Sequence, residues 1–309
     1  MKHVILLVGP TAIGKTKMSI SLATKLRCEV ISADSKQIYK NMNIGTAKPT
    51  RLEQNGIKHY LIDYIDPNQI YTVYDYLQDA IKAINNTLQY HNVTIITGGS
   101  GLYVNAIYNY YNMNEISLSD IPSISDNIRN QVRKLYTEKG LEECVKKLLE
   151  LDTNSNKHIE LKNPQRVQRA LEVILQTQRP IYSFYNQTKH NNVNYDISFI
   201  NIGLKMDMYQ LYERIEKRID IMFEQGLIDE VKSLYKYKDC NALNTIGYKE
   251  VFDYLDGKIS LQDTKNIIKQ NTRHFAKRQM TWFKHQLPVT WFDYDVEDEI
   301  YEFIKGHLE

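Results

Sequence analysis

Residues 9–16 read Gly-Pro-Thr-Ala-Ile-Gly-Lys-Thr and match the phosphate-loop pattern G-x-x-x-x-G-K-[ST] at every fixed position. The apolar, β-branched run at residues 4–8 precedes this stretch and is typical of a buried parallel strand. After it, Met18, Leu22 and Leu26 recur at helical spacing. Strand, glycine-rich loop and helix is the arrangement that this motif requires. The sequence therefore predicts a site for a di- or oligophosphate.

The residues of this loop are expected to contribute in different ways. Gly9 and Gly14 let the backbone bend so that successive N–H groups point into one concavity at a helix N-terminus. Lys15 adds a positive charge, and the hydroxyl of Thr16 is suited to ligate a Mg²⁺ that is also coordinated by the phosphates. The predicted phosphate-binding residues are Gly9, Pro10, Thr11, Ala12, Ile13, Gly14, Lys15 and Thr16.

The composition is that of an ordinary globular protein, with 42% hydrophobic and 25% charged residues in a chain of 309. A net charge of +2 does not by itself indicate nucleic-acid binding, which would need basic residues gathered on one face. Cys28, Cys144 and Cys240 are few and scattered, which favours reduced thiols. No stretch reaches the length of a membrane span, so we expect a soluble, cytoplasmic protein.

Two further stretches follow predicted strands. Residues 29–33 are expected to deliver residues 34–37 (Asp-Ser-Lys-Gln) to the carboxyl end of a strand, and residues 93–96 run into the glycine-rich residues 98–101. Ligands of open parallel sheets bind at that edge, which places Asp34 where a catalytic carboxylate would be useful. Capping of a turn explains Asp34 equally well from its position alone. The glycine-rich stretch is a weak signal by itself.

Alternation of strands and helices gives way to helical periodicity between residues 115 and 195, which predicts a helical insertion between two parts of one core, residues 1–114 and 196–309. The best marked helix begins with Asn163 as N-cap and Pro164 at its first position. Its outer side carries Gln165, Arg166, Gln168 and Arg169. Such a face is more often merely solvated. Contacts with phosphates and bases are the alternative.

Two later helices carry basic residues. Arg214 and Arg218 lie four residues apart on one predicted helix, and either pairing with nearby glutamates or an anion clamp explains them. Residues 260–286 are predicted to form mostly one helix, whose basic stripe consists of Arg273, Lys277 and Lys284. Aromatic residues interleave with this stripe, which suggests a nucleic-acid surface, although such aromatics are more often part of a core.

Seven motifs in one order resemble the tRNA dimethylallyltransferase (IPP transferase) family over nearly the whole chain. They are residues 9–16, 31–39 (Ile-Ser-Ala-Asp-Ser-Lys-Gln-Ile-Tyr), 44–49 (Ile-Gly-Thr-Ala-Lys-Pro), 98–103 (Gly-Gly-Ser-Gly-Leu-Tyr), 163–172 (Asn-Pro-Gln-Arg-Val-Gln-Arg-Ala-Leu-Glu), 246–250 (Ile-Gly-Tyr-Lys-Glu) and 275–283 (Phe-Ala-Lys-Arg-Gln-Met-Thr-Trp-Phe). The phosphate loop alone would not separate this family from kinases, whereas the whole set does.

The resemblance implies an α/β fold with a P-loop NTPase-like parallel-sheet core and an all-helical insertion domain. It implies transfer of the dimethylallyl group from dimethylallyl diphosphate to the exocyclic amine of the adenosine 3′-adjacent to the anticodon in tRNA, with release of diphosphate. The implied cofactor is Mg²⁺, and the implied macromolecular partner of this monomeric enzyme is the anticodon stem-loop of tRNA.

The resemblance also implies roles for individual residues. Asp34 would be the general base, Ser100 would lie beside the reacting groups, and Lys15 and Arg218, together with Arg214, would hold the diphosphate. The implied tRNA contacts are Asp34, Ser35, Lys36, Gln37, Ser100, Gln165, Arg166, Val167, Gln168, Arg169, Arg273 and Lys277.

Three positions depart from the family pattern. Ser100 stands where threonine is commoner and keeps the hydroxyl, and Tyr60 replaces the second histidine of a common pair. Ile13 replaces a small residue in a loop whose backbone does the binding. Three rival functions remain at this point: an adenylate isopentenyltransferase, a P-loop small-molecule kinase, and a catalytically silent phosphate-binding protein. The helical insertion and the basic helices favour tRNA over a mononucleotide.

Overall fold

The computed structural model describes residues 1–112, 124–184 and 196–309. The chain forms two compact units, the first of Met1–Tyr111 with Asn192–Glu309 and the second of Asn112–Asn191. The borders predicted for the insertion, at residues 115 and 195, lie outside the described residues.

The first unit is built on one sheet of six strands in the order β3-β2-β4-β1-β5-β6. Every neighbouring pair in it is parallel. The strands are β1 (Lys2–Val8), β2 (Val30–Ser32), β3 (His59–Tyr60), β4 (Val93–Gly98), β5 (Ile197–Lys205) and β6 (Thr290–Asp293). The apolar run that predicted the first strand is fully buried in the middle of the sheet, as a parallel strand covered on both faces must be. The predicted α/β class with a parallel sheet is confirmed.

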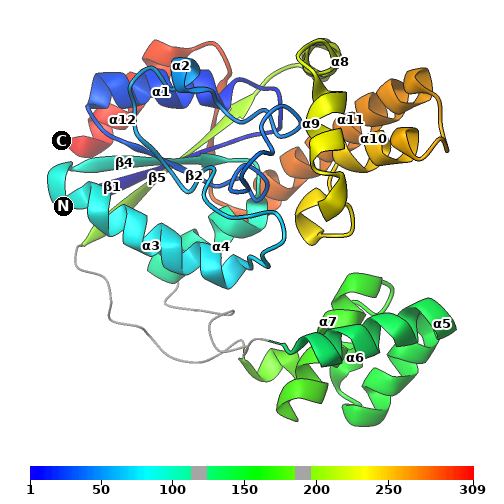
Figure 1. The fold of residues 1–309 in the computed structure, drawn as a ribbon. Coiled ribbons are helices and arrows are strands. Elements are labelled where there is room, and N and C mark those ends of the chain that lie inside the picture. The colour runs from blue at the N-terminus through cyan, green and yellow to red at the C-terminus, as the bar shows by residue number, and fades with distance from the viewer. Residues whose placement is uncertain (113–123, 185–195) are drawn as a thin grey trace. The chain divides into compact units, whose positions relative to one another are not determined.

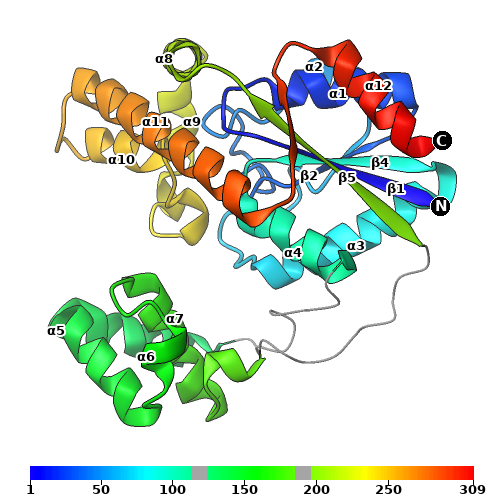
Figure 2. The ribbon, with the colours of Figure 1, turned by 180° about the vertical axis from the view of Figure 1, so that it is seen from behind.

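Helices cover both faces of the sheet (Figures 1 and 2). On one face lie α1 (Lys15–Leu26), α12 (Glu297–Leu308) and the short α2 (Arg51–Gln54), and on the other lie α3 (Val73–Tyr90) and α4 (Gly101–Asn112). Helix α3 begins in a capping box, in which Thr72 and Asp75 satisfy each other's backbone N–H groups. Its buried stripe, including Leu77, Ile84 and Leu88, packs on the sheet at helical spacing.

A further group of helices stands beyond the carboxyl ends of the strands (Figure 1). They are α8 (Met208–Glu224), α9 (Leu227–Ser233), α10 (Tyr248–Leu255) and α11 (Leu261–Gln286), with the 3₁₀ turns η2 (Tyr235–Tyr237) and η3 (Asn241–Leu243) between them. Strand β5 leads directly into α8, whose first turn is capped by the side chain of Asp207. Because parallel strands present their carboxyl ends at one edge, this group of helices lies beside the loops that follow β1, β2 and β4.

The sequence pattern of residues 59–65 predicts a strand, but β3 ends after its second residue, Tyr60, so the prediction is wrong from residue 61 onward. Leu61 and Asp63 adopt positive φ angles of 58°, which break an extended strand. The backbone N–H groups of Tyr64 and Ile65 then donate to the carbonyl of Ile38 rather than to a strand of the sheet. This segment therefore serves as a support for the loop that follows Asp34.

The second unit is all-helical in its described part. It contains α5 (Asp126–Leu151), α6 (Ser155–His158), α7 (Pro164–Thr177) and η1 (Ile181–Phe184). Gly140 interrupts α5 with φ 79° and divides it into two helical segments. The segments and α7 enclose a core of their own, to which Val132, Cys144, Leu148, Val167 and Leu171 belong. Within the described segments of both units, no helix is at once long enough and apolar enough to cross a membrane.

Candidate active site

The phosphate loop connects β1 to α1 at the carboxyl edge of the sheet. Gly14 has φ 109°, a conformation that favours glycine, and it places Lys15 at the start of the helix. Ala12 has φ 65°, which is uncommon for a residue with a side chain and marks a strained loop. The side chain of Ile13 is fully buried in the main core and anchors the loop from beneath. The loop is thus held in the curved form that directs backbone N–H groups to one side.

Lys15 lies folded back over the loop. Its Nζ donates hydrogen bonds to the carbonyl oxygens of Gly9 (2.9 Å) and Pro10 (2.8 Å). Burial lowers the pKa of Lys15 to about 7; the charge of Asp34 opposes this effect and the charge of Arg218 adds to it. The amine is therefore poised to gain charge when an anion arrives.

Arg218 approaches the same loop from helix α8. It donates a hydrogen bond of 2.6 Å to the hydroxyl of Thr11, and its Nε is buried with no hydrogen-bond partner among the described residues. Burial lowers its pKa to about 10, against the opposing effect of Asp34 and with a smaller lowering from Arg214. Neither Arg214 nor Arg218 forms an ion pair within the described chain; Arg214 instead lies over the ring of Tyr294. Two unpaired guanidiniums beside a phosphate loop form a strong anion site.

Asp34 follows β2 and faces this basic group. Its Oδ1 accepts hydrogen bonds from the backbone N–H groups of Lys36 (2.9 Å) and Gln37 (3.3 Å). Its Oδ2 accepts none from any residue that the structure describes. The turn cap expected from the sequence is therefore present at Oδ1. The catalytic role of Asp34 stays a prediction, for which Oδ2 is the available oxygen.

Ser100 joins the loop after β4 to the loop after β2. Its hydroxyl oxygen accepts a hydrogen bond from the backbone N–H of Ser35 at 2.9 Å and lies 3.1 Å from the hydroxyl of the same residue. Lys36 is directed elsewhere: its Nζ donates to the carbonyls of Asn241 and Ala242, and burial lowers its pKa to about 8, against the opposing charge of Asp34.

Two cavities open onto Asp34. The first, of about 800 Å³, includes the phosphate loop with Lys15 and Thr16 as well as Arg214. The second, of about 500 Å³, lies toward α10 and α11 and includes Ser35, Lys36 and Ser100. The residues that border both are Thr11, Asp34, Thr46, Gly99, Arg218, Phe275 and Gln279. A diphosphate in the first cavity and a second reactant in the other would therefore meet beside the carboxylate.

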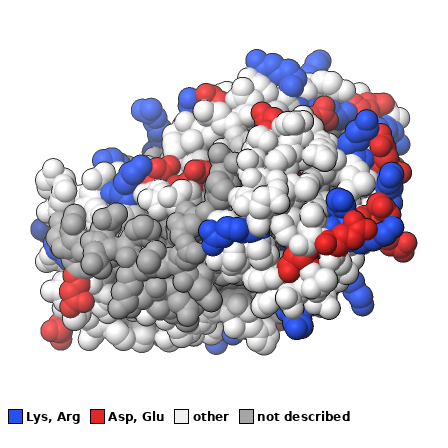
Figure 3. Space-filling model, turned by 90° about the horizontal axis from the view of Figure 1, so that it is seen from below, with Lys and Arg blue, Asp and Glu red and all other residues white. Residues whose placement is uncertain are grey.

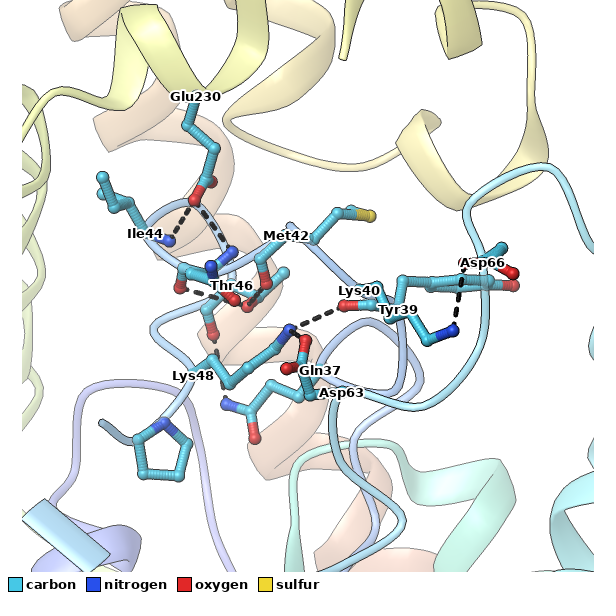
Figure 4. A network of polar contacts seen from close by, with 12 residues as sticks. Gln37, Tyr39, Lys40, Met42, Ile44, Thr46, Lys48, Asp63, Asp66 and Glu230 are labelled. Carbon is cyan, nitrogen blue, oxygen red and sulfur yellow. Dashed lines mark hydrogen bonds and ion pairs between the residues drawn. The ribbon is translucent and has the colours of Figure 1, made fainter. Parts of the chain in front are cut away.

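A dense polar network fixes the loop that runs from Gln37 to Lys48 along these cavities (Figure 4). Gln37 donates from its amide to the carbonyls of Thr46 and Ala47, and Lys48 donates to the carbonyl of Tyr39 and to Asp63. From helix α9, the carboxylate of Glu230 accepts hydrogen bonds from the N–H groups of Asn43, Ile44 and Gly45. Sequence reasoning missed Glu230, because only the fold brings α9 to this loop.

Only part of the predicted basic stripe of α11 is free to contact a nucleic acid. Arg273 forms an ion pair with Glu216 of α8, so its charge is partnered within the protein. Lys277 is exposed and forms no ion pair with any described residue, and the exposed ring of Phe275 borders both cavities. Figure 3 shows one face of the molecule, on which Lys and Arg side chains are scattered among acidic ones.

In the second unit, the residues predicted to contact tRNA lie on α7. The side chain of Asn163 caps this helix by accepting from the N–H groups of Gln165 and Arg166, both of which are exposed. Gln168 is half-buried, and Arg169 pairs with Glu172 at 3.3 Å. Val167 is fully buried in the core of the unit, so its side chain packs there and is not presented to a ligand.

Gln279 is a site residue that sequence reasoning missed. It is a polar residue on the buried stripe of α11, between Ala276 and Phe283, and that placement was the available signal. Its amide connects two of the loops around Asp34.

Comparison with known proteins places this arrangement in a family. Residues 37–286 match the family described as IPP transferase. The chain belongs to this family. A tRNA dimethylallyltransferase of Christiangramia forsetii is 40% identical over 99% of this chain and 98% of its own length. A tRNA dimethylallyltransferase of Bacillus anthracis is 41% identical over 100% of this chain and 97% of its own length.

Solved structures of IPP transferases agree. The tRNA isopentenylpyrophosphate transferase of Bacillus halodurans is 39% identical, covers 100% of this chain and 97% of its own, and superposes with a TM-score of 0.71. A eukaryotic dimethylallyltransferase acting on tRNA is 25% identical, with a TM-score of 0.76, and covers 100% of this chain and 78% of its own. The P-loop NTPase-like core predicted from the sequence is the fold of this family.

Proposed function

We propose that this IPP transferase moves the dimethylallyl group of dimethylallyl diphosphate to the exocyclic amine of an adenosine in tRNA, at the position 3′-adjacent to the anticodon, and releases diphosphate. The observation that carries this proposal is the position of Asp34 between two cavities, one lined by the phosphate loop and two arginines. Membership of a family whose relatives are named for this reaction supports it.

The first cavity suits a diphosphate leaving group. As the allylic C–O bond breaks, negative charge develops on the diphosphate. The start of α1, Lys15 and Arg218 all line this cavity, so their N–H donors lie close to the place where that charge would develop. Donors held in place before the reaction lower such a barrier. Loss of one comparable donor typically costs ~10²–10³ in rate.

Asp34 is the proposed general base. The exocyclic nitrogen of adenine attacks the allylic carbon, a C–N bond forms as the C–O bond to diphosphate breaks, and the nitrogen must lose a proton. The free Oδ2 of Asp34 can accept it, while Oδ1 stays bound to the turn that holds the residue. Ser35, Ser100 and Gln37 are proposed to contact the extruded nucleotide, because a base must leave its stack to reach such a site.

Mg²⁺ is the proposed cofactor. The Thr16 hydroxyl lines the first cavity, whereas the described residues contain no group of three or more His, Cys, Asp or Glu side chains that could hold a metal by themselves. This donor set fits a Mg²⁺ held mainly through diphosphate oxygens, with Thr16 as its protein ligand. When bound, the ion would supply further positive charge to the leaving group.

The tRNA is proposed to contact the exposed polar face of α7, with Gln165 and Arg166, and the exposed Lys277 of α11. Gln168, Arg169 and Arg273 are proposed as secondary contacts, since they are half-buried and both arginines already hold an acidic partner. We further propose that the enzyme acts as a monomer in the cytoplasm.

The decisive experiment supplies dimethylallyl diphosphate, Mg²⁺ and unmodified tRNA, and then maps the modified nucleotide by mass spectrometry of nuclease fragments. Parallel reactions replace tRNA by free AMP, or dimethylallyl diphosphate by radiolabelled ATP. Transfer to the adenosine beside the anticodon supports the proposal. Efficient transfer to AMP would assign an adenylate isopentenyltransferase, and label moving from ATP to a small acceptor would assign a kinase.

A further inference from the structure

The side chain of Gln279 connects two loops that belong to different strands. It projects from the buried face of α11 and is only 6% exposed. Its carbonyl Oε1 accepts a hydrogen bond of 2.8 Å from the backbone N–H of Thr11, in the phosphate loop. Its Nε2 donates a hydrogen bond of 2.8 Å to the backbone carbonyl of Gly99, after β4. A buried amide satisfied at both ends holds its two partners at a fixed separation.

The chemistry of these partners permits only one orientation of the amide. A backbone N–H can only donate and a backbone carbonyl can only accept, so the oxygen of Gln279 must face Thr11 and its nitrogen must face Gly99. A carboxylate at this position would lack the donor for Gly99, and an aliphatic side chain would lack both groups. Glutamine is therefore suited to this place in a way that similarly sized residues are not.

The connection continues from Gly99 to the proposed base. The next residue, Ser100, donates its N–H to the carbonyl of Ala33 at 3.1 Å and accepts at its hydroxyl from the N–H of Ser35. These two contacts lie on either side of Asp34 in the chain. A continuous path of hydrogen bonds thus runs from the phosphate loop through Gln279 and Ser100 to the segment that carries Asp34.

We propose that Gln279 is a positioning residue that sets the geometry between the diphosphate and the attacking amine. This inference rests on the proposed function. The displacement requires the leaving oxygen, the allylic carbon and the nitrogen to lie in line. The phosphate loop, which Gln279 contacts directly, holds one end of that line. The segment of Asp34, which Gln279 reaches through Gly99 and Ser100, holds the other. Misplacement by ~1 Å in such a reaction can cost ~10²-fold in rate. Binding of either substrate alone does not depend on the alignment.

Misalignment has its own chemical signature. If the allylic C–O bond breaks while the amine is out of line, water can attack the allylic carbon. A C–O bond to the water oxygen then forms, a proton is released, and the products are dimethylallyl alcohol and diphosphate. The ratio of alcohol formed to groups transferred therefore reports alignment, which a change in folding stability alone would not alter.

Gly99 provides an independent way to disturb the same contact. A Cβ at Gly99 would lie 2.3 Å from Nε2 of Gln279, so Gly99→Ala must displace the amide. The backbone of Gly99 is outside the left-handed region, so the alanine adds no conformational strain. Shortening the partner in Gln279→Ala makes room for that methyl group. The two substitutions should consequently be non-additive, as expected for residues in contact.

The experiment compares Gln279→Leu, Gln279→Ala, Gly99→Ala and the double variant Gln279→Ala with Gly99→Ala. Met280→Leu is the matched control, because Met280 is the next residue of α11 and does not border either cavity. For each protein, kcat for transfer, the ratio of hydrolysis to transfer, the Kd for dimethylallyl diphosphate alone and the Kd for tRNA alone are measured. Thermal unfolding is recorded alongside.

We expect Gln279→Leu and Gly99→Ala to lower kcat by ~10–100-fold and to raise the hydrolysis ratio, with both Kd values near those of the wild type. The double variant should be no worse than Gln279→Ala. If Kd for dimethylallyl diphosphate rises as much as kcat/KM falls, Gln279 is only part of the diphosphate pocket and the proposal is overturned. An unchanged hydrolysis ratio, or additive effects, would overturn it as well. A wild type that transfers nothing to tRNA refutes the proposed function instead, and the proposed role of Gln279 with it.

Discussion

Arg218 on helix α8 donates a 2.6 Å hydrogen bond to the hydroxyl of Thr11 in the phosphate loop. The two residues lie 207 positions apart in the chain, so the completed fold closes α8 over the loop and leaves the guanidinium beside the place of the leaving group. The same arginine carries a buried Nε without a partner among the described residues, which gives an incoming oxyanion a donor.

The substitution Arg218→Gln should therefore slow the reaction, by weakening stabilisation of the transition state, more than it lowers the folding stability of the protein. We expect kcat/KM for dimethylallyl diphosphate to fall by ~10²–10³. Lys217→Gln is the matched control, because Lys217 is exposed on the same helix and away from the cavity. Steady-state kinetics at saturating tRNA measure both. An Arg218→Gln enzyme within a few-fold of the control would exclude this role.

Asp34→Asn tests the proposed base with little structural disturbance. The amide oxygen of asparagine can still accept from the N–H groups of Lys36 and Gln37, so the turn should persist. Loss of the proton acceptor should lower kcat by ~10²–10⁴. Single-turnover transfer measures the chemical step directly, with Asp229→Asn on the exposed side of α9 as control. Transfer at a near wild-type rate would contradict the assignment.

Lys15 predicts a pH dependence of diphosphate binding. Burial lowers its pKa to about 7, so the free enzyme carries the charge below that pH and loses it above. Since the bound anion favours the charged amine, binding above pH 7 must be accompanied by proton uptake. Apparent affinity for dimethylallyl diphosphate should then fall by up to about tenfold per pH unit above pH 7.

The control for this pH dependence is Lys15→Met, which should bind weakly at every pH and lose the decline above pH 7. Calorimetry in two buffers of different ionisation enthalpy would show the proton uptake. Equal affinity of the wild type at pH 6.5 and pH 8.5 would contradict the prediction.

Arg166 should contribute to tRNA affinity through a phosphate contact. It is exposed on α7, whereas Arg169 on the same helix is paired with Glu172. Arg166→Gln should weaken tRNA binding and reduce the slope of log Kd against log salt by ~1. Lys139→Gln, an exposed position on α5, is the control. Fluorescence titration with a labelled anticodon stem-loop measures both, and identical slopes would remove Arg166 from the interface.

Gly45 should tolerate no side chain. A Cβ there would lie 2.5 Å from the ring of Tyr248, which is fully buried and donates a 2.6 Å hydrogen bond to Glu230. Gly45→Ala should lower the free energy of unfolding by ~1–3 kcal/mol through overpacking. Gly306→Ala, in helix α12 with nothing near its Cβ, should instead raise that free energy by ~0.5–1 kcal/mol. Urea unfolding of both variants measures these free energies. A Gly45→Ala protein as stable as the wild type would contradict the prediction.

Much of the sheet and the phosphate loop could be predicted because their signals are local. The apolar run before Gly9 and the helical repeat after Lys15 each lie within a few residues. Parallel strands share one carboxyl edge, so the sequence alone predicts that the loops carrying Asp34 and Ser100 lie near the phosphate loop.

Features that depend on distant contacts could not be predicted in this way. Residues 61–65 leave the strand pattern because their backbone bonds to Ile38, and nothing in their own composition requires it. The pairing of Arg273 with Glu216 joins two helices whose crossing the sequence does not specify. Glu230 acts through backbone groups of a remote loop, for which no residue pattern exists. For Gln279 the pattern shows a polar residue on a buried stripe, but not the loops that it contacts.

The position of β5 in the sheet has a consequence for the order in which the protein folds during its synthesis. Strand β1 is flanked by β4 and β5, yet its register places Lys2 opposite Ile197, so the central strand cannot be completely paired until nearly two thirds of the chain has been synthesised. The helical unit between them makes mainly local contacts and can fold earlier on the ribosome. The contacts of Thr11 in the phosphate loop come from Arg218 and Gln279, so this loop can be completed only after those later residues have been synthesised.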